Sequence, residues 1–252
     1  MAWKNEYNNA KKVIQNGTFK EKAEYIWDYY KWHLVGLIVI LGMIGSLIYS
    51  RVTAKECVLQ GIFLNSTAEK DAELELEKNF LAFSPIDESK EEILFDASYY
   101  FSTDIISTVA ENSYETLQII TAKIAAEEVD FIVGDLTSMN NIAYREYFYD
   151  LSEVLPEELM KKYEAYFLYY DRSFVEKMKN TDMTYDHTTP IVYPDPKKPE
   201  LMEEPVPVFI DVSKCKNLQE IYPYRKEECL ISFAVNGKNN TKALEFINFI
   251  ME

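Results

Sequence analysis

The chain has 252 residues, 48% hydrophobic and 27% charged, a composition typical of a folded protein. Its net charge is −16, and residues 1–51 hold seven of the 26 basic and four of the 42 acidic side chains, which leaves 19 against 38, or −19, in residues 52–252. Binding to nucleic-acid phosphates needs clustered positive charge, so this balance argues against a nucleic-acid partner and favours a solvated acidic surface.

An apolar run occupies residues 32–50, WHLVGLIVILGMIGSLIYS, and contains no Asp, Glu, Lys or Arg. Its length of 19 residues is close to the roughly 20 that an α-helix needs to cross a bilayer core. Trp32 and Tyr49 lie at its ends, where aromatic side chains favour the membrane interface, and Lys31 and Arg51 flank it. The run predicts a transmembrane helix in preference to a buried core helix.

The surroundings of this run favour a cytoplasmic N-terminus and an extracytoplasmic domain. Residues 1–31 carry six Lys and form a short cytoplasmic tail, whereas long acidic domains are translocated with little regard to charge. The run begins too far into the chain for a cleaved signal peptide. Cys57 follows Ala-Lys-Glu, where a lipobox has small or aliphatic residues, so we expect no lipid on it. Residues 51–56 are expected to be a linker and residues 57–252 one domain.

Beyond the linker, segments with strand and helix character alternate. Apolar, β-branched and aromatic residues predict strands over 57–65, 92–100 and 129–135. Helical periodicity predicts helices over 68–83, 113–128 and 139–148, with Ser113 as a helix N-cap. The β-α-β-α-β-α order predicts an α/β domain built on a mainly parallel sheet.

The C-terminal third has a different character. Residues 171–207 carry six of the nine prolines and predict an extended, Pro-rich connector. Residues 206–213 and 229–236 follow as two predicted strands, and residues 241–252 as a closing amphipathic helix.

Polar and aromatic residues follow the predicted strands of the first part. Ligands of open α/β sheets bind beyond the carboxyl ends of the strands, because loops there leave a crevice between neighbouring strands. We therefore predict ligand-binding roles for the residues at those ends and for one tyrosine in the helix after the third strand: Asn65, Ser66, Ser98, Tyr99, Asp135 and Tyr144.

Two runs resemble a known family. They are LQIITAKIAAEEVDFIVGDLTSMNNIAYREYFYDLSEVLP and FAVNGKNNTKALEFINFIME, together about 60 of the 252 residues. They resemble segments of the family 1 extracellular solute-binding proteins of bacterial ABC importers. The resemblance implies a periplasmic-binding-protein-like fold, a small solute as ligand and a transporter as partner.

The chain departs from this family in two ways. The family usually has Gly and then Pro-Asp at the junction of helix and strand, whereas this chain has Glu127, Glu128 and Val129 and keeps only Asp130. Members are roughly twice as long, and about 50 residues between Leu155 and Pro207 are too few for a full second lobe. We expect the first lobe with a reduced second one, held by a helix where the family typically uses a lipid.

The sequence predicts no enzyme, no cofactor and no metal site. It has two His, His33 and His187, no H-E-x-x-H or G-x-S-x-G motif, and no glycine-rich phosphate loop. Cys215 and Cys229 lie where an extracytoplasmic disulfide could form, or they remain two free thiols.

Two functions remain open at this stage. The first is binding of a small polar solute, such as a saccharide, for uptake or sensing. The second is a cell-surface interaction module that has no solute and docks to a transporter or envelope protein. A concave crevice of polar and aromatic side chains at the strand ends would favour the first, and a filled strand-end surface the second.

Overall fold

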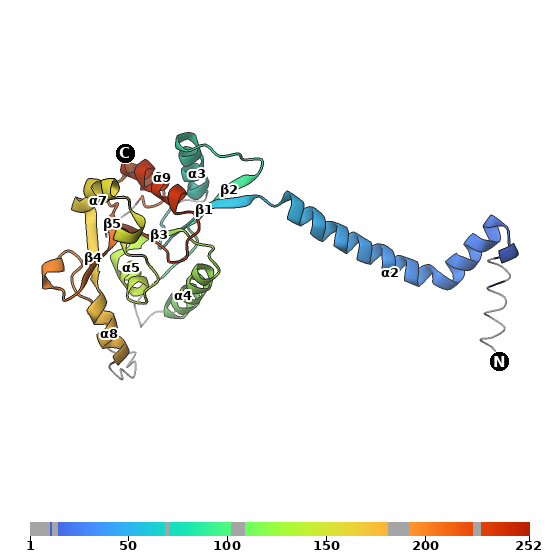
Figure 1. Cartoon of the computed structure of the whole chain (residues 1–252), viewed down its shortest axis with the longest axis horizontal. Helices are drawn as coiled ribbons and strands as arrows, with labels where there is room; N and C mark the ends of the chain where they lie inside the picture. The colour runs from blue at the N-terminus through green and yellow to red at the C-terminus, as the bar shows by residue number, and fades with distance from the viewer. Residues whose placement is uncertain (1–10, 12–14, 69–70, 102–108, 181–191, 224–227) are drawn as a thin grey trace. The chain divides into compact units, whose positions relative to one another are not determined.

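The structure, a computed structural model, describes residues 11, 15–68, 71–101, 109–180, 192–223 and 228–252. Its contacts divide the chain into two units, Met1–Ala54 and Lys55–Glu252. The first unit holds one long helix, and the second holds a six-stranded sheet. Figure 1 labels the long helix and most elements of the second unit.

The long helix is α2, Phe19–Thr53. Its stretch Tyr30–Thr53, 24 residues, is long and apolar enough to cross a membrane, and none of it is buried within the structure. A helix that exposes apolar side chains all round needs an apolar environment, which a bilayer supplies. The predicted span is therefore supported, whereas its orientation stays a prediction. Residues 19–31 of the predicted tail are helical and continuous with the span, and only Ala54 and Lys55 separate α2 from the first strand.

The second unit is built on one sheet, with the strand order β2-β1-β3-β6-β5-β4. The strands are β1 Glu56–Phe63, β2 Glu91–Asp96, β3 Phe131–Asp135, β4 Phe167–Asp171, β5 Pro205–Asp211 and β6 Cys229–Phe233. β1 is parallel to β2 and β3, but the pairs β3–β6, β6–β5 and β5–β4 are antiparallel. The predicted α/β class is confirmed, and the prediction of a mainly parallel sheet is wrong.

The antiparallel pairing of β6 with β5 has a local cause. Parallel neighbours need a crossover connection, usually a helix. Helix α3, Ala72–Phe83, provides one after β1, and helix α4, Val109–Ala125, provides one after β2. In the described part of the connection between β5 and β6 there is only the short 3-10 helix η3, Lys216–Leu218. β6 therefore returns antiparallel to β5.

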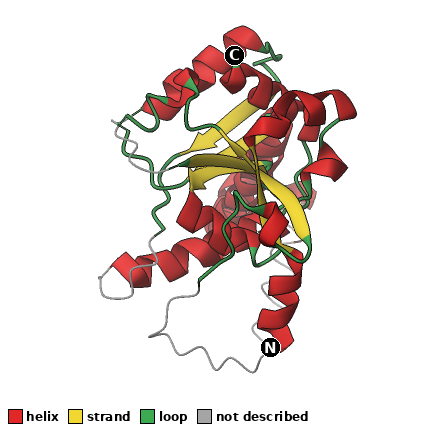
Figure 2. Cartoon of the chain, turned by 90° about the vertical axis from the view of Figure 1, so that its left-hand side faces the viewer, coloured by secondary structure: helices red, strands yellow, loops and turns green. Residues whose placement is uncertain are grey.

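Helices cover both faces of the sheet, as Figure 2 shows. Side chains alternate along each strand, so Leu59 and Phe63 of β1 face one core cluster and Ile62 faces the other. The first cluster receives α3, Ala72–Phe83, and α9, Asn240–Met251; the second receives α4, Val109–Ala125, and α5, Leu136–Ala143. The remaining helices are α6 Leu151–Val154, α7 Glu157–Tyr163, α8 Arg172–Asn180, η1 Glu164–Tyr166 and η2 Pro199–Leu201.

Phenylalanine rings dominate the first cluster. Phe131 of β3 and Phe246 of α9 are stacked with their centroids 4.5 Å apart, and Phe246 also lies 5.0 Å from Phe95. The Phe131 ring covers Gly61 so closely that a Cβ there would lie 2.2 Å from its Cζ. Gly61 is therefore required by the approach of this ring rather than by its backbone conformation.

Several predicted boundaries are corrected. α4 begins at Val109, so Ser113 lies inside the helix and is not its N-cap. The third predicted helix starts directly after Asp135, three residues earlier than residue 139. The connector predicted over 171–207 begins with α8, and its residues 181–191 lie outside the described residues.

The described end of this connector lies along β4, where the backbone N–H of Tyr169 donates to the carbonyl of Pro196 at 2.9 Å. The buried carboxylate of Asp171 holds the next turn, because it accepts from the backbone N–H groups of Glu203 and Glu204 at 3.1 Å each. The Pro-rich segment therefore covers one edge of the sheet.

Candidate functional site

The candidate site lies at one end of the strands. At this end β1, β2, β3 and β5 finish and β6 and β4 begin. The chain leaves β1 through α3 on one face and reaches β3 through α4 on the other face. Such a reversal between neighbouring parallel strands is where α/β proteins bind ligands. The residues that follow β1 and end β3 therefore test the predicted site.

Asn65 and Asp135 meet at this reversal, as predicted. The Asn65 amide Nδ2 donates to Asp135 Oδ2 at 2.6 Å, to Ser138 Oγ at 3.0 Å and to the carbonyl of Phe101 at 2.7 Å. Asn65 Oδ1 accepts from the backbone N–H of Phe101 at 2.7 Å. Asn65 has φ 54°, a left-handed conformation that asparagine tolerates better than most residues.

Both carboxylate oxygens of Asp135 accept hydrogen bonds from the chain itself. As the N-cap of α5, its Oδ1 accepts from the backbone N–H of Ser138 at 2.9 Å. Its Oδ2 accepts from the Ser138 hydroxyl at 2.7 Å as well as from Asn65. The two predicted residues thus form a closed network with Ser138 and Phe101, and neither of those two was predicted.

The other side of the reversal is occupied by residues 221–222. The Tyr222 hydroxyl donates to the carbonyls of Leu64 at 2.8 Å and Val133 at 3.2 Å, and its side chain is buried. Ser66 is buried too, and its hydroxyl donates to the carbonyl of Ile221 at 2.7 Å. Ser66 therefore anchors this segment, and Tyr222 takes up hydrogen-bonding capacity at the ends of β1 and β3.

Ser98 and Tyr99 follow β2 but do not join the network through their side chains. The Ser98 N–H and hydroxyl both donate to Asp96 Oδ1, at 3.0 and 2.6 Å, in a local turn. Tyr99 contributes its backbone carbonyl, which accepts from the N–H of Asn65 at 2.9 Å. Burial, followed by the neighbouring Asp96 carboxylate, raises the pKa of the Tyr99 hydroxyl.

Tyr144 lies at the opposite end of the strands, away from Asp135. α5 starts at Asp135 and runs back along the sheet, so its C-cap Tyr144 reaches the end of β4. There its ring stacks on Tyr193 at 4.5 Å, and its oxygen accepts from the N–H of Asp171 at 3.3 Å. Burial raises the pKa of the Tyr144 hydroxyl to about 12, so it stays protonated at neutral pH. The prediction that Tyr144 shares a site with Asp135 is not met.

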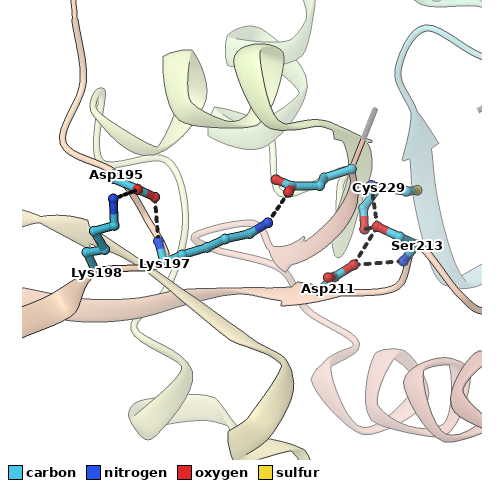
Figure 3. Close-up of polar contacts among 7 residues, drawn as sticks. Asp195, Lys197, Lys198, Asp211, Ser213 and Cys229 are labelled. Carbon is cyan, nitrogen blue, oxygen red and sulfur yellow. Dashed lines mark hydrogen bonds and ion pairs between the residues drawn. The ribbon is translucent and has the colours of Figure 1, made fainter. Parts of the chain in front are cut away.

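A second cluster of polar residues lies at the same end of the strands as the candidate site, near the end of β5 and the start of β6 (Figure 3). Ser213 donates its hydroxyl to Asp211 and accepts from the N–H of Cys229 at 2.9 Å. Lys197 of the connector forms an ion pair with Glu228, which precedes β6. These contacts fix the turn after β5 and tie the connector to the residue before β6.

The remaining predicted chemistry is only partly visible. The structure draws no disulfide bond between the three cysteines; Cys215 Sγ lies 3.5 Å from Met251 Sδ, and Cys229 is buried in β6. A disulfide between Cys215 and Cys229 stays a prediction. Within the described ranges, no group of three or more His, Cys, Asp or Glu side chains is arranged to hold a metal ion. His187 lies outside the described residues.

Comparison with known proteins adds no family to this geometry. No protein-family model matches the chain. A search of curated proteins finds no significant match either. The resemblance to solute-binding proteins therefore rests on the quoted runs alone, and it stays a prediction, as does the periplasmic-binding-protein-like fold.

Proposed function

We propose that this chain is a single-pass membrane protein whose α/β domain acts by binding another protein, not by capturing a solute. The observation that carries the proposal is the closed network at the strand ends. Asn65 uses both its amide nitrogen and its oxygen internally, and both Asp135 oxygens accept hydrogen bonds from the chain itself.

A solute at this site would have to break these bonds. Buried polar groups that lose a partner cost about 1–3 kcal/mol each, so a ligand must replace every bond that it displaces. Tyr222 would also have to leave the carbonyls of Leu64 and Val133. Solute binding, the other function open from the sequence, would require this rearrangement.

The helix supports the membrane part of the proposal. Tyr30–Thr53 would anchor the domain, with the N-terminus in the cytoplasm and residues 55–252 outside, where a transporter or an envelope protein is within reach. Tags at the two ends test this orientation. Protease added to intact cells should remove a C-terminal tag and spare an N-terminal one, and the reverse pattern would overturn it.

Thermal unfolding of residues 55–252 tests the choice between protein and solute. This unit contains all six described strands and both core clusters, so it can be studied without α2. A ligand at 100 times its Kd adds about 2.7 kcal/mol, which raises the midpoint by several degrees. We expect no such shift with any sugar, amino acid or short neutral peptide. A clear shift with one solute class, abolished by Asp135→Ala, would refute the proposal and establish solute binding.

A further inference from the structure

The two outer strands of the sheet, β4 and β2, differ in whether another part of the chain covers their outer edges. The outer edge of β4 is covered by the connector, where the backbone N–H of Tyr169 donates to the carbonyl of Pro196 at 2.9 Å. At the other end, β2 is paired with β1 alone among the described strands. Unpaired edges accept additional strands unless side chains protect them.

The hydrogen bonds of β2 show which backbone groups point outward. Lys90 directs its carbonyl to β1, where it accepts from the N–H of Glu56 at 2.7 Å. Successive residues of a strand direct their backbone N–H and C=O groups to opposite sides. Glu91, Ile93 and Phe95 therefore direct these groups away from β1. The N–H of Glu91 is used by the turn before β2, since it donates to the Asp87 carbonyl at 2.8 Å.

The outward N–H of Phe95 is bound by a side chain. It donates to Glu77 Oε1 of α3 at 2.9 Å, so a carboxylate stands where the carbonyl of a neighbouring strand would stand. Burial raises the pKa of the Glu77 carboxyl, and the nearby Glu73 and Glu92 carboxylates raise it further. A cation brought beside Glu77 would favour its ionised form.

We propose that the outer edge of β2 binds an extended segment of a partner protein in which basic and apolar residues alternate. The inference rests on the proposed function and specifies its surface and its partner's chemistry. The Glu91 and Glu92 side chains lie on this strand, and the Leu94 side chain, 41% exposed, offers apolar contact. Backbone hydrogen bonds would supply affinity and the charges specificity, as in other strand additions.

The same charges argue against a second copy as the occupant. Two β2 edges side by side would bring Glu91 and Glu92 of each copy against an acidic edge, and like charges on neighbouring strands are destabilising. A neutral segment would displace Glu77 from Phe95 and leave a half-buried carboxylate without a partner. A Lys or Arg in the partner removes that cost.

The test uses the full chain in nanodiscs of zwitterionic lipid and a fluorescent peptide in which lysine alternates with valine. We expect binding by fluorescence anisotropy that weakens as salt is raised, and no binding of the peptide with glutamate in place of lysine. The double variant Glu91→Lys, Glu92→Lys should weaken binding by about tenfold or more, a loss of 1.4 kcal/mol per factor of ten. Its matched control, Glu157→Lys with Glu158→Lys on the exposed start of α7, should stay within about twofold.

Hydrogen exchange locates the peptide. Bound peptide should slow exchange at the amides of Ile93 and Phe95, because both would then donate to the added strand. Glu77→Gln keeps an acceptor for Phe95 but loses the charge, so it should weaken binding of the lysine peptide without unfolding the domain. Equal loss in the α7 control, or exchange protection elsewhere than β2, would overturn the inference.

The outcomes separate this inference from the proposed function. If the peptide does not bind and no solute shifts the unfolding midpoint, the β2 edge is only a protected edge and this inference alone fails. A solute-dependent shift refutes the proposed function whether or not the peptide binds.

Discussion

Replacing Phe246 by alanine should cost the domain a large part of its stability. Phe246 is fully buried, and its ring lies within 6.3 Å of the rings of Phe63, Phe80, Phe95, Phe131 and Phe249. Core Phe→Ala changes cost about 3–5 kcal/mol, and aromatic pairs add about 0.5–1.5 kcal/mol each beyond buried area. We therefore expect a loss near 5 kcal/mol, against a total of about 5–15 kcal/mol for a typical domain.

Urea unfolding of residues 55–252 measures this loss. Circular dichroism is the suitable signal, because Trp3, Trp27 and Trp32 all precede the domain. With a urea slope of about 2 kcal/mol per M, the midpoint should fall by about 2 M, or the variant should not fold. Phe246→Leu keeps most of the apolar volume and should lose about 2 kcal/mol, which keeps the comparison measurable.

The control for this series is Phe83→Ala. Phe83 stacks on Phe80 and lies 5.5 Å from Phe249, but it is 42% exposed. Its truncation should cost about 1 kcal/mol, since much of its surface already meets water. If the two variants lower the free energy of unfolding by the same amount, the rings around Phe246 add nothing beyond burial, and the reasoning is refuted.

Three further changes probe separate features. Gly61→Ala should cost about 3 kcal/mol in urea unfolding, more than Gly134→Ala, since the new Cβ would lie 2.2 Å from Phe131 Cζ rather than 3.1 Å from Leu64 Cβ. Asp130→Ala should cost about 3 kcal/mol, because the 2% exposed carboxylate accepts from the N–H groups of Gln60 at 2.8 Å and Asn239 at 2.9 Å; a loss below about 1 kcal/mol would contradict this. Burial by itself raises the pKa of Asp171, but hydrogen bonds from Ser173, Glu203 and Glu204 outweigh it and lower the pKa below 3.8. Its contribution to stability is therefore present above pH 3.8 and lost as the pH falls through the lowered value, so Asp171→Asn should destabilise at neutral pH and progressively less in acid; a pH-independent difference would contradict the sign.

Local patterns were enough to predict the first half of the domain. The strands over 57–65, 92–100 and 129–135 correspond to β1, β2 and β3, and the helices between them to α3 and α4. β4 was missed, although FLYYD is aromatic, because its place in the sheet depends on pairing with β5 more than thirty residues later. Strand direction in the second half was missed for a similar reason, since it follows from the connections between strands rather than from their composition.

The candidate site was half predicted. The rule about strand ends brings Asn65 and Asp135 together correctly, with Nδ2 and Oδ2 2.6 Å apart. It fails for Tyr144, because a helix of 8 residues carries its last residue about 12 Å from its start. Tyr222 gives no local signal at all: its hydroxyl bonds to Leu64, which is 158 residues away in sequence.

The position of β6 has a consequence for how the domain is made. β6, Cys229–Phe233, is the last of the described strands in sequence, yet it lies between β3 and β5. Until it has been synthesised, the strands β2, β1 and β3 have no neighbour that joins them to β5 and β4. Pairing between distant segments is slow because loop closure must come first. The two halves of the sheet can therefore join only after β6 has been made, so the sheet closes late in synthesis.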